Sequence, residues 1–226
     1  MRLAEEILLL DRADDGMLSR APKWLIRYAL GGAVLMDLAL ENRIDTDADR
    51  LFLIDSAPVG DALLDRVLAE IAGASESHDA LYWVEHATRH ADEIRESALL
   101  RLVDNGILAV HDERYLRIFG TRRYMLVRQE TERELTGRIK AVLLSPAIPD
   151  PKDVVIVTLA DGCGLLGEVL SADELEQAVP RIELLRKMDL IGRAFLDALE
   201  LVVQPAASKL DRRQSGAPLA DTPGET

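Results

Sequence analysis

Residues 24–40 read WLIRYALGGAVLMDLAL and form the longest apolar stretch of this 226-residue sequence. Pro22 precedes the stretch, and proline is well suited to the first turn of a helix. Apolar or small residues fall on every face of such a helix, which is typical of a helix surrounded by others. Arg27 and Asp37 interrupt it before about 18 uncharged residues accumulate, so it is too short to span a membrane. We expect a buried central helix.

Other segments have the apolar spacing of helices packed around this centre. Asn105 and Gly106 supply the left-handed capping chemistry that ends one of them. A short apolar run at 50–55 is long enough for a strand. We predict a mainly α fold, a compact helical bundle around a buried apolar central helix with a protruding β-hairpin. The predicted outer segments are Leu3–Leu10 (helix or extended), Asp61–Ala72, Asp79–Thr88, Asp92–Asp104, Glu130–Leu144 and helices from about Asp153, Asp173 and Leu190.

The predicted hairpin has strands at 107–110 and 115–119, joined by the polar turn HDER at 111–114. Arginines and aromatic residues alternate in and after it. Such a patch can hold phosphate oxygens while its apolar tips enter a membrane interface. It equally suits an edge guarded by charge or paired with another subunit. The residues predicted to contact a membrane or an oligomer partner are Tyr115, Leu116, Arg117, Ile118 and Phe119.

Composition indicates one folded domain over 1–203 and a flexible C-terminal tail over 204–226, where Pro, Ala, Ser and Gly replace the apolar periodicity. The net charge of −13 opposes long-range attraction to nucleic acid and anionic membranes, so an anion site must be local. The single cysteine, Cys163, cannot form an intrachain disulfide, and glutamates interrupt the N-terminal apolar run. We expect a cytoplasmic protein. If it associates with a membrane, we expect it to bind peripherally at the inner membrane face.

Two motifs suggest a cofactor or a metal. Residues 162–167 spell GxGxxG after the apolar run 154–157, but no second strand ends in an acidic residue about twenty positions later. A glycine-loosened helix or loop is the better interpretation. His86 and His90 share a helix face as zinc-binding pairs do, yet no third ligand is evident, and a solvated polar face beside Arg89 is favoured.

Single residues give little support for catalysis. Cys163 lacks a setting that would lower its pKa and is predicted to be a small core residue. Asp37 inside the apolar helix could be a catalytic acid, but pairing with backbone donors or a cation, Arg43 or Arg27, is favoured. No P-loop and no GxSxG motif is present in the sequence. We therefore predict no enzymatic activity, no cofactor and no metal site.

Four segments in order along about two hundred residues resemble the Golgi phosphoprotein 3 (Vps74) family. They are LAEEILLL at 3–10, GAVLMDLAL with the following Arg43 and Ile44, PVGDALLD at 58–65, and RLVDNGIL at 101–108. The resemblance implies a helical fold, a hairpin used in self-association, and peripheral membrane binding through phosphatidylinositol 4-phosphate. Eukaryotic members are adaptors that retain Golgi glycosyltransferases. The chain begins almost at the first segment, and we expect a prokaryotic relative.

The resemblance also implies a lipid-headgroup site at Trp24, Arg27 and Arg95. The family's first arginine aligns with Gly31, and Arg27 lies one turn away as its substitute. Arg95 matches the second basic position of the later helix, whereas the first aligns with Asp92.

Three interpretations of function remain open at this point. One is a peripheral membrane or adaptor module that binds an anionic phospholipid headgroup and forms a homo-oligomer through the hairpin. A second is a soluble protein-interaction scaffold, with an unknown protein client and no lipid role. The third is a winged-helix DNA binder formed by the helix from about Asp92 and the hairpin, although the net charge favours no nucleic-acid partner.

Overall fold

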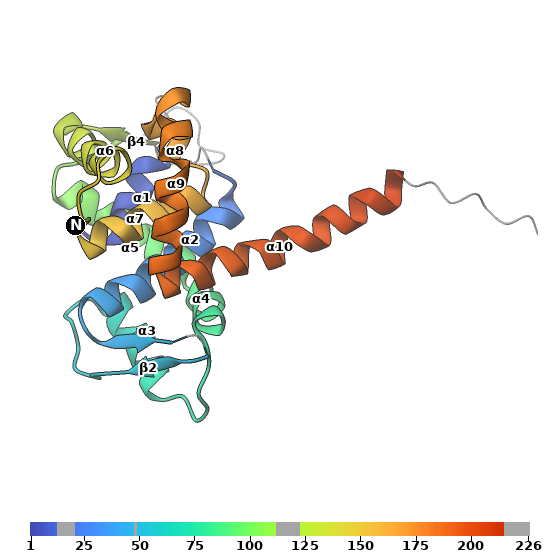
Figure 1. Ribbon diagram of the computed structural model, residues 1–226. Helices are drawn as coiled ribbons and strands as arrows, with labels where there is room; N and C mark the ends of the chain where they lie inside the picture. Colours follow the sequence, from blue (N-terminus) through green and yellow to red (C-terminus); the bar gives the residue numbers. More distant parts are fainter. Residues whose placement is uncertain (13–20, 48, 112–122, 215–226) are drawn as a thin grey trace, which may run out of the picture.

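The computed structural model describes residues 1–12, 21–47, 49–111 and 123–214, which form ten helices and four short strands. The mainly α bundle predicted from the sequence is confirmed (Figure 1). In chain order the elements are α1 (Leu3–Leu10), α2 (Lys23–Leu40), β1 (Ile44–Thr46), β2 (Leu51–Leu53), α3 (Ala62–Ala72), α4 (Ala80–Thr88), α5 (Ala91–Asp104), β3 (Leu108–His111), β4 (Arg123–Leu126), α6 (Gln129–Leu144), α7 (Pro151–Gly162), α8 (Leu166–Val169), α9 (Ala172–Met188) and α10 (Leu190–Gln214).

Helix α2 is the centre of the bundle, as its apolar sequence predicts. It packs against α1, α3, α4, α5, α7 and α10, and every residue from position 29 to 38 is buried. Two glycines allow neighbours to approach on different sides: Gly31 faces α4, while a Cβ at Gly32 would lie 3.5 Å from Leu159 and 3.6 Å from Phe195. The close approach of α4 explains the glycine at position 31, whereas a Cβ at position 32 would make ordinary van der Waals contacts.

Helix α1 is buried along its whole length although it carries two carboxylates. Glu5 forms an ion pair with Arg101 of α5 at 2.6 Å. Glu6 lies 3.3 Å from Arg138 of α6 and 3.0 Å from Lys152 of α7. A charge is retained in an interior only when it is paired, so these contacts tie α1 to three neighbouring helices.

Local capping signals set several helix ends. Asp61 begins α3 by accepting hydrogen bonds from the N–H groups of Leu63 and Leu64. Asp79 begins α4 in the same way, through the N–H of Tyr82. Gly106 follows α5 with φ of +64°, a left-handed conformation that glycine adopts without strain. These boundaries agree with those predicted from the sequence.

A two-stranded hairpin sheet is present, but the strand that pairs with β3 differs from the predicted one. Strand β3 pairs antiparallel with β4 in the register Leu108 to Leu126, so its partner among the described residues is Arg123–Leu126 and not 115–119. Tyr124 is buried while Met125 is exposed, an alternation that positions the strand against the core. The predicted contact residues at 115–119 lie outside the described residues. A second hairpin, β1 with β2, adds a strand that the sequence did not indicate.

The GxGxxG motif begins at the end of a helix. This agrees with its interpretation as a glycine-loosened helix or loop. The apolar run at 154–157 is part of α7, so no strand precedes the glycines. A Cβ at Gly162 would lie 2.5 Å from the Phe195 ring, and Gly164 has φ of +69°. Close packing and a turn therefore account for these glycines.

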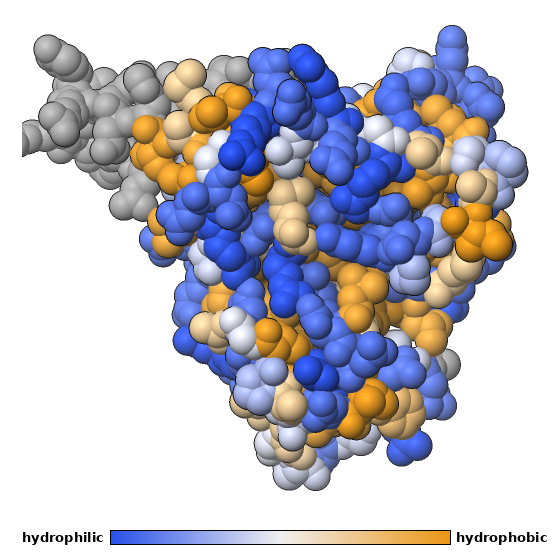
Figure 2. Space-filling model, turned by 90° about the vertical axis from the view of Figure 1, so that its left-hand side faces the viewer, coloured by the Kyte–Doolittle hydropathy of each residue, from blue (hydrophilic) through white to orange (hydrophobic). Residues whose placement is uncertain are grey.

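Helix α10 extends away from the body of the molecule (Figure 1). It continues to Gln214, beyond position 204 where composition placed the start of a tail. The assignment of 1–203 as a single domain stays a prediction. Within the described ranges, no helix has the length and apolarity needed to cross a bilayer. On the face drawn in Figure 2, apolar residues form separate patches between hydrophilic ones.

Candidate functional site

Trp24 and Arg27 lie one turn apart near the N-terminus of α2. Trp24 is 37% exposed, although it belongs to the stretch whose later part is fully buried. The helix begins after Pro22, and no side chain caps it. Unpaired N–H groups and the helix dipole make such an end favourable for a negative charge.

Arg27 is joined to α5 by an ion pair. Its Nη1 atom lies 2.6 Å from Oδ1 of Asp92, in the first turn of α5. The Asp92 side chain is 83% exposed, so solvent reaches this pair freely. Asp92, which the resemblance aligns with a basic position, is therefore the ion-pair partner of Arg27.

Arg95 follows Asp92 by three positions on α5, so the two side chains are neighbours on the helix surface. Its side chain is half-buried and forms no hydrogen bond or ion pair with another residue in the described part of the chain. We call the surface formed by Trp24, Arg27, Asp92 and Arg95 the α2–α5 patch. The ion pair with Asp92 thus links Arg27, but not Trp24 directly, to the helix that carries Arg95.

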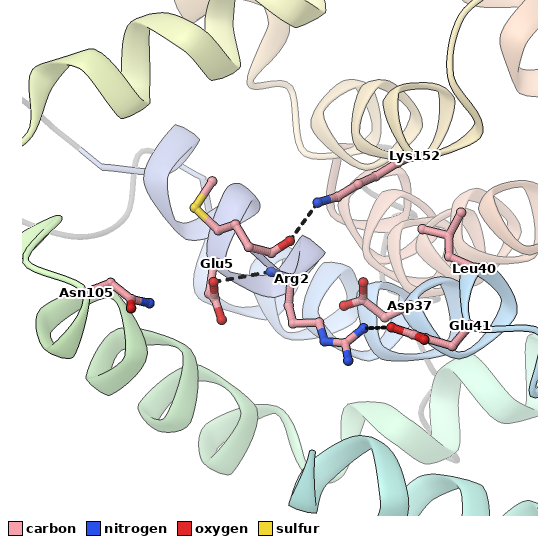
Figure 3. A pocket seen from close by; sticks show the side chains of 8 residues that line it. Arg2, Glu5, Asp37, Leu40, Glu41, Asn105 and Lys152 are labelled. Carbon is pink, nitrogen blue, oxygen red and sulfur yellow. Dashed lines mark hydrogen bonds and ion pairs between the residues drawn. The ribbon is translucent and has the colours of Figure 1, made fainter. Parts of the chain in front are cut away.

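A separate pocket of about 490 Å³ opens between α1, α2 and α7 (Figure 3). Its two basic side chains are both paired: Arg2 lies 2.6 Å from Glu41, and Lys152 lies 3.0 Å from Glu6 and donates to the carbonyl of Met1 at 2.6 Å. Cations that are already paired are less available to select an anion. The pocket is lined by Met1, Arg2, Glu5, Asp37, Leu40, Glu41, Asn105 and Lys152.

Asp37 borders this pocket and binds the start of α1. Its Oδ2 accepts a hydrogen bond from the N–H of Leu3 at 3.1 Å, so a backbone donor, one of the two partner types expected from the sequence, is present. Burial, reinforced by Glu6, raises the pKa of Asp37 to about 7, against the opposing effects of the Leu3 N–H and the Arg2 and Lys152 charges. The prediction that Arg43 or Arg27 pairs with Asp37 was wrong, because Arg43 pairs with Asp55 and Arg27 pairs with Asp92.

Comparison with known proteins identifies the family. The family model of Golgi phosphoprotein 3 (GPP34) matches residues 3–202. The chain belongs to the Golgi phosphoprotein 3 family. It is also 26% identical over 240 residues to vacuolar protein sorting-associated protein 74 of Eremothecium gossypii, a match that covers 90% of this chain and 68% of that protein. The family resemblance of the four sequence segments is therefore confirmed, while a prokaryotic origin stays a prediction.

Gly31, which the resemblance aligns with an arginine, is packed closely against α4. A Cβ at this position would lie 2.7 Å from Oγ1 and 2.8 Å from the backbone N of Thr88 in α4. This Golgi phosphoprotein 3 family member therefore has no room for an arginine at position 31. Any cation near the start of α2 must come from another position, such as Arg27.

The described part of the hairpin has an exposed apolar outer face. Met125 is 52% exposed and Val127 is 59% exposed, and Ala109, the register partner of Met125, is exposed too. The contact residues predicted from the sequence lie at 115–119, and Met125 and Val127 are not among them. Their alternation with buried Tyr124 and half-buried Leu126 was the signal that could have revealed them.

Two further predictions concern His86, His90 and Cys163. Glu70 of α3 contacts both histidines, so the structure supplies the third potential metal ligand that the sequence did not show. Glu70 lies sixteen residues before His86, so no short sequence motif indicates that the two side chains meet. Cys163 is buried as predicted, and desolvation, with Asp11 and Asp161 nearby, raises the pKa of its thiol. A thiol that stays protonated is a poor nucleophile.

Proposed function

We propose that this Golgi phosphoprotein 3 family member is a non-enzymatic peripheral membrane or adaptor module that binds an anionic phospholipid headgroup, such as phosphatidylinositol 4-phosphate, at the α2–α5 patch. The observation that carries the proposal is Arg95, a half-buried cation with no partner among the described residues, on the helix joined to Arg27. Trp24 is exposed one turn before Arg27, near the uncapped start of α2.

The Arg27–Asp92 pair is compatible with phosphate binding because it is weak. Exposed ion pairs contribute between zero and about 1 kcal/mol, and Asp92 is almost fully exposed. Phosphate oxygens form stronger, charge-assisted hydrogen bonds with a guanidinium group. A phosphate headgroup can therefore replace Asp92 as the partner of the Arg27 guanidinium. The Asp92 carboxylate remains nearby, and its repulsion of the phosphate weakens headgroup binding.

Trp24 suits the boundary between headgroups and acyl chains, since an indole ring is apolar with one polar N–H. Met125 and Val127 on the hairpin offer apolar contact to a bilayer or to a second copy of the chain. The net charge of −13 disfavours a general attraction to anionic bilayers. Binding should therefore depend on the local patch and be strongest at low ionic strength.

Flotation of the full chain with neutral phosphatidylcholine vesicles, with or without phosphatidylinositol 4-phosphate, tests the proposal. Wild-type protein should float only with the anionic vesicles at low salt. Arg95→Ala should weaken this binding about tenfold, because a charge-assisted contact contributes about 1.5–3 kcal/mol. Arg66→Ala is the matched control, since Arg66 is an exposed arginine of α3 paired with Glu93 outside the patch.

Equal binding by Arg95→Ala and wild type would contradict the assigned site. A wild-type protein that ignored all anionic vesicles at low salt would overturn the lipid role. The soluble scaffold would then be favoured, because the exposed face of Met125 and Val127 is available to a protein client or to self-association.

A further inference from the structure

Three side chains from two parts of the fold meet beside α4. The Nε2 atom of His86 lies 2.9 Å from a carboxylate oxygen of Glu70, and Nε2 of His90 lies 3.2 Å from the same carboxylate. One potential ligand atom from each residue lies within 4.8 Å of the others. We propose that Glu70, His86 and His90 bind a divalent transition-metal ion, with Zn²⁺ the best chemical fit.

The donor types and their spacing support this assignment. Two imidazole nitrogens and one carboxylate form a common three-ligand set for zinc, with a fourth position left for water. Tetrahedral ligands at about 2.0–2.1 Å from zinc lie roughly 3.3 Å from one another. The two observed separations from Glu70, 2.9 and 3.2 Å, are close to that value. The ligand atoms of His86 and His90 lie within 4.8 Å of each other, so the two rings must adjust toward the tetrahedral separation when the ion binds.

The three ligands are held in place yet remain accessible. Their side chains are 32%, 20% and 19% exposed for Glu70, His86 and His90. The His86 ring packs against the ring of Tyr82 and the edge of Trp83, with centroids 5.9 and 5.2 Å away. Such packing restricts the ring before an ion arrives, which lowers the entropic cost of binding.

Without an ion, hydrogen bonds from the two Nε2–H groups to Glu70 explain the same contacts. Metal binding requires each Nε2 to lose its proton, so the neutral ring of His86 carries its proton on Nδ1. That nitrogen lies 3.4 Å from Nη1 of Arg89, which is itself a donor and a cation. Arg89 is exposed and can turn away. The positive charge of Arg89 should nevertheless weaken binding of the metal ion.

The ion would join α3 to the junction between α4 and α5, because His90 is the residue that precedes α5. An ion that binds only the folded chain stabilises it, and the gain in free energy rises with the logarithm of the ion concentration above Kd. At a Zn²⁺ concentration one hundred times Kd, Tm should rise by about 5 °C for a chain of this size. This inference is independent of the proposed lipid role.

Titration of Zn²⁺ alone into the full chain by isothermal calorimetry tests the site. One ion per chain should bind. His86→Ala, His90→Ala and Glu70→Gln should each weaken binding at least about tenfold. Arg89→Ala should bind as tightly as wild type or more tightly. His78→Ala is the control, because His78 stacks on Tyr82 without belonging to the ligand set.

A spectroscopic readout locates the ion and shows that the variants are folded. The chain has two tryptophans, so Trp24→Phe leaves Trp83 as the only fluorophore of this kind. Cu²⁺ bound beside His86 should quench Trp83 in this background, and His90→Ala should lose the quenching while keeping the emission of a buried indole. Absence of heat and quenching at millimolar metal would overturn the proposal. Unchanged affinity in His86→Ala and His90→Ala would overturn it too.

Discussion

Arg101→Met is expected to lower the free energy of unfolding by about 3 kcal/mol or more, because it removes the partner of a buried carboxylate. Arg101 contacts Glu5 at 2.6 Å and Asp61 at 2.5 Å. The Glu5 side chain is almost completely buried, so water cannot replace the lost guanidinium. Asp61 keeps its capping hydrogen bonds to α3, which limits the loss on that side.

Urea unfolding followed by circular dichroism measures this effect. Arg66→Met is the matched control, since Arg66 and its partner Glu93 are both exposed, and should change stability by less than about 0.5 kcal/mol. Adding Glu5→Leu to Arg101→Met should recover part of the loss, because no buried charge then remains at position 5. Equal stability of Arg101→Met and wild type would show that the pair does not support the fold.

Gly31→Ala is expected to destabilise the protein by about 2–3 kcal/mol, although alanine is the better helix former. The new Cβ would lie under 3.0 Å from Oγ1 and the backbone N of Thr88, so α4 would have to move. Oγ1 of Thr88 is itself held by a hydrogen bond to the carbonyl of Val84 at 2.8 Å. The clash therefore involves groups that cannot rotate aside.

Gly137→Ala in α6 is the matched comparison, and it is expected to stabilise the protein where Gly31→Ala destabilises it. A Cβ at Gly137 meets nothing within 4 Å, so this substitution should raise the free energy of unfolding by about 0.5–1 kcal/mol. Thermal unfolding of both variants is the measurement. A Gly31→Ala protein with Tm raised like that of Gly137→Ala would contradict the close packing of α2 on α4.

Features determined by neighbouring residues were predictable from the sequence. The long apolar run predicted the buried helix α2, and Asp61, Asp79 and Gly106 marked helix ends through local hydrogen bonding and backbone conformation. The arrangement of Trp24 and Arg27 one turn apart also follows directly from helix periodicity.

Features that depend on distant partners were not predictable. The buried role of Glu6 requires Arg138 and Lys152, more than 130 positions away, and Glu70 joins His90 only after α3 and α4 fold. The hairpin partner of Leu108 is Leu126, because pairing depends on which alternate residues the core covers. The pair between Arg27 and Asp92 likewise required the three-dimensional arrangement of two helices.

Vesicle flotation of Asp92→Asn tests the central claim most directly, because the claim makes Arg27 a headgroup ligand restrained by Asp92. The variant should bind anionic vesicles about five- to tenfold more tightly than wild type at low salt, since Arg27 is released and a repulsive carboxylate is removed. Glu76→Gln, which removes an exposed charge in the loop before α4, is the control for net charge. Adding Arg27→Ala to Asp92→Asn should abolish the gain. Binding by Asp92→Asn no tighter than that of Glu76→Gln would contradict the account.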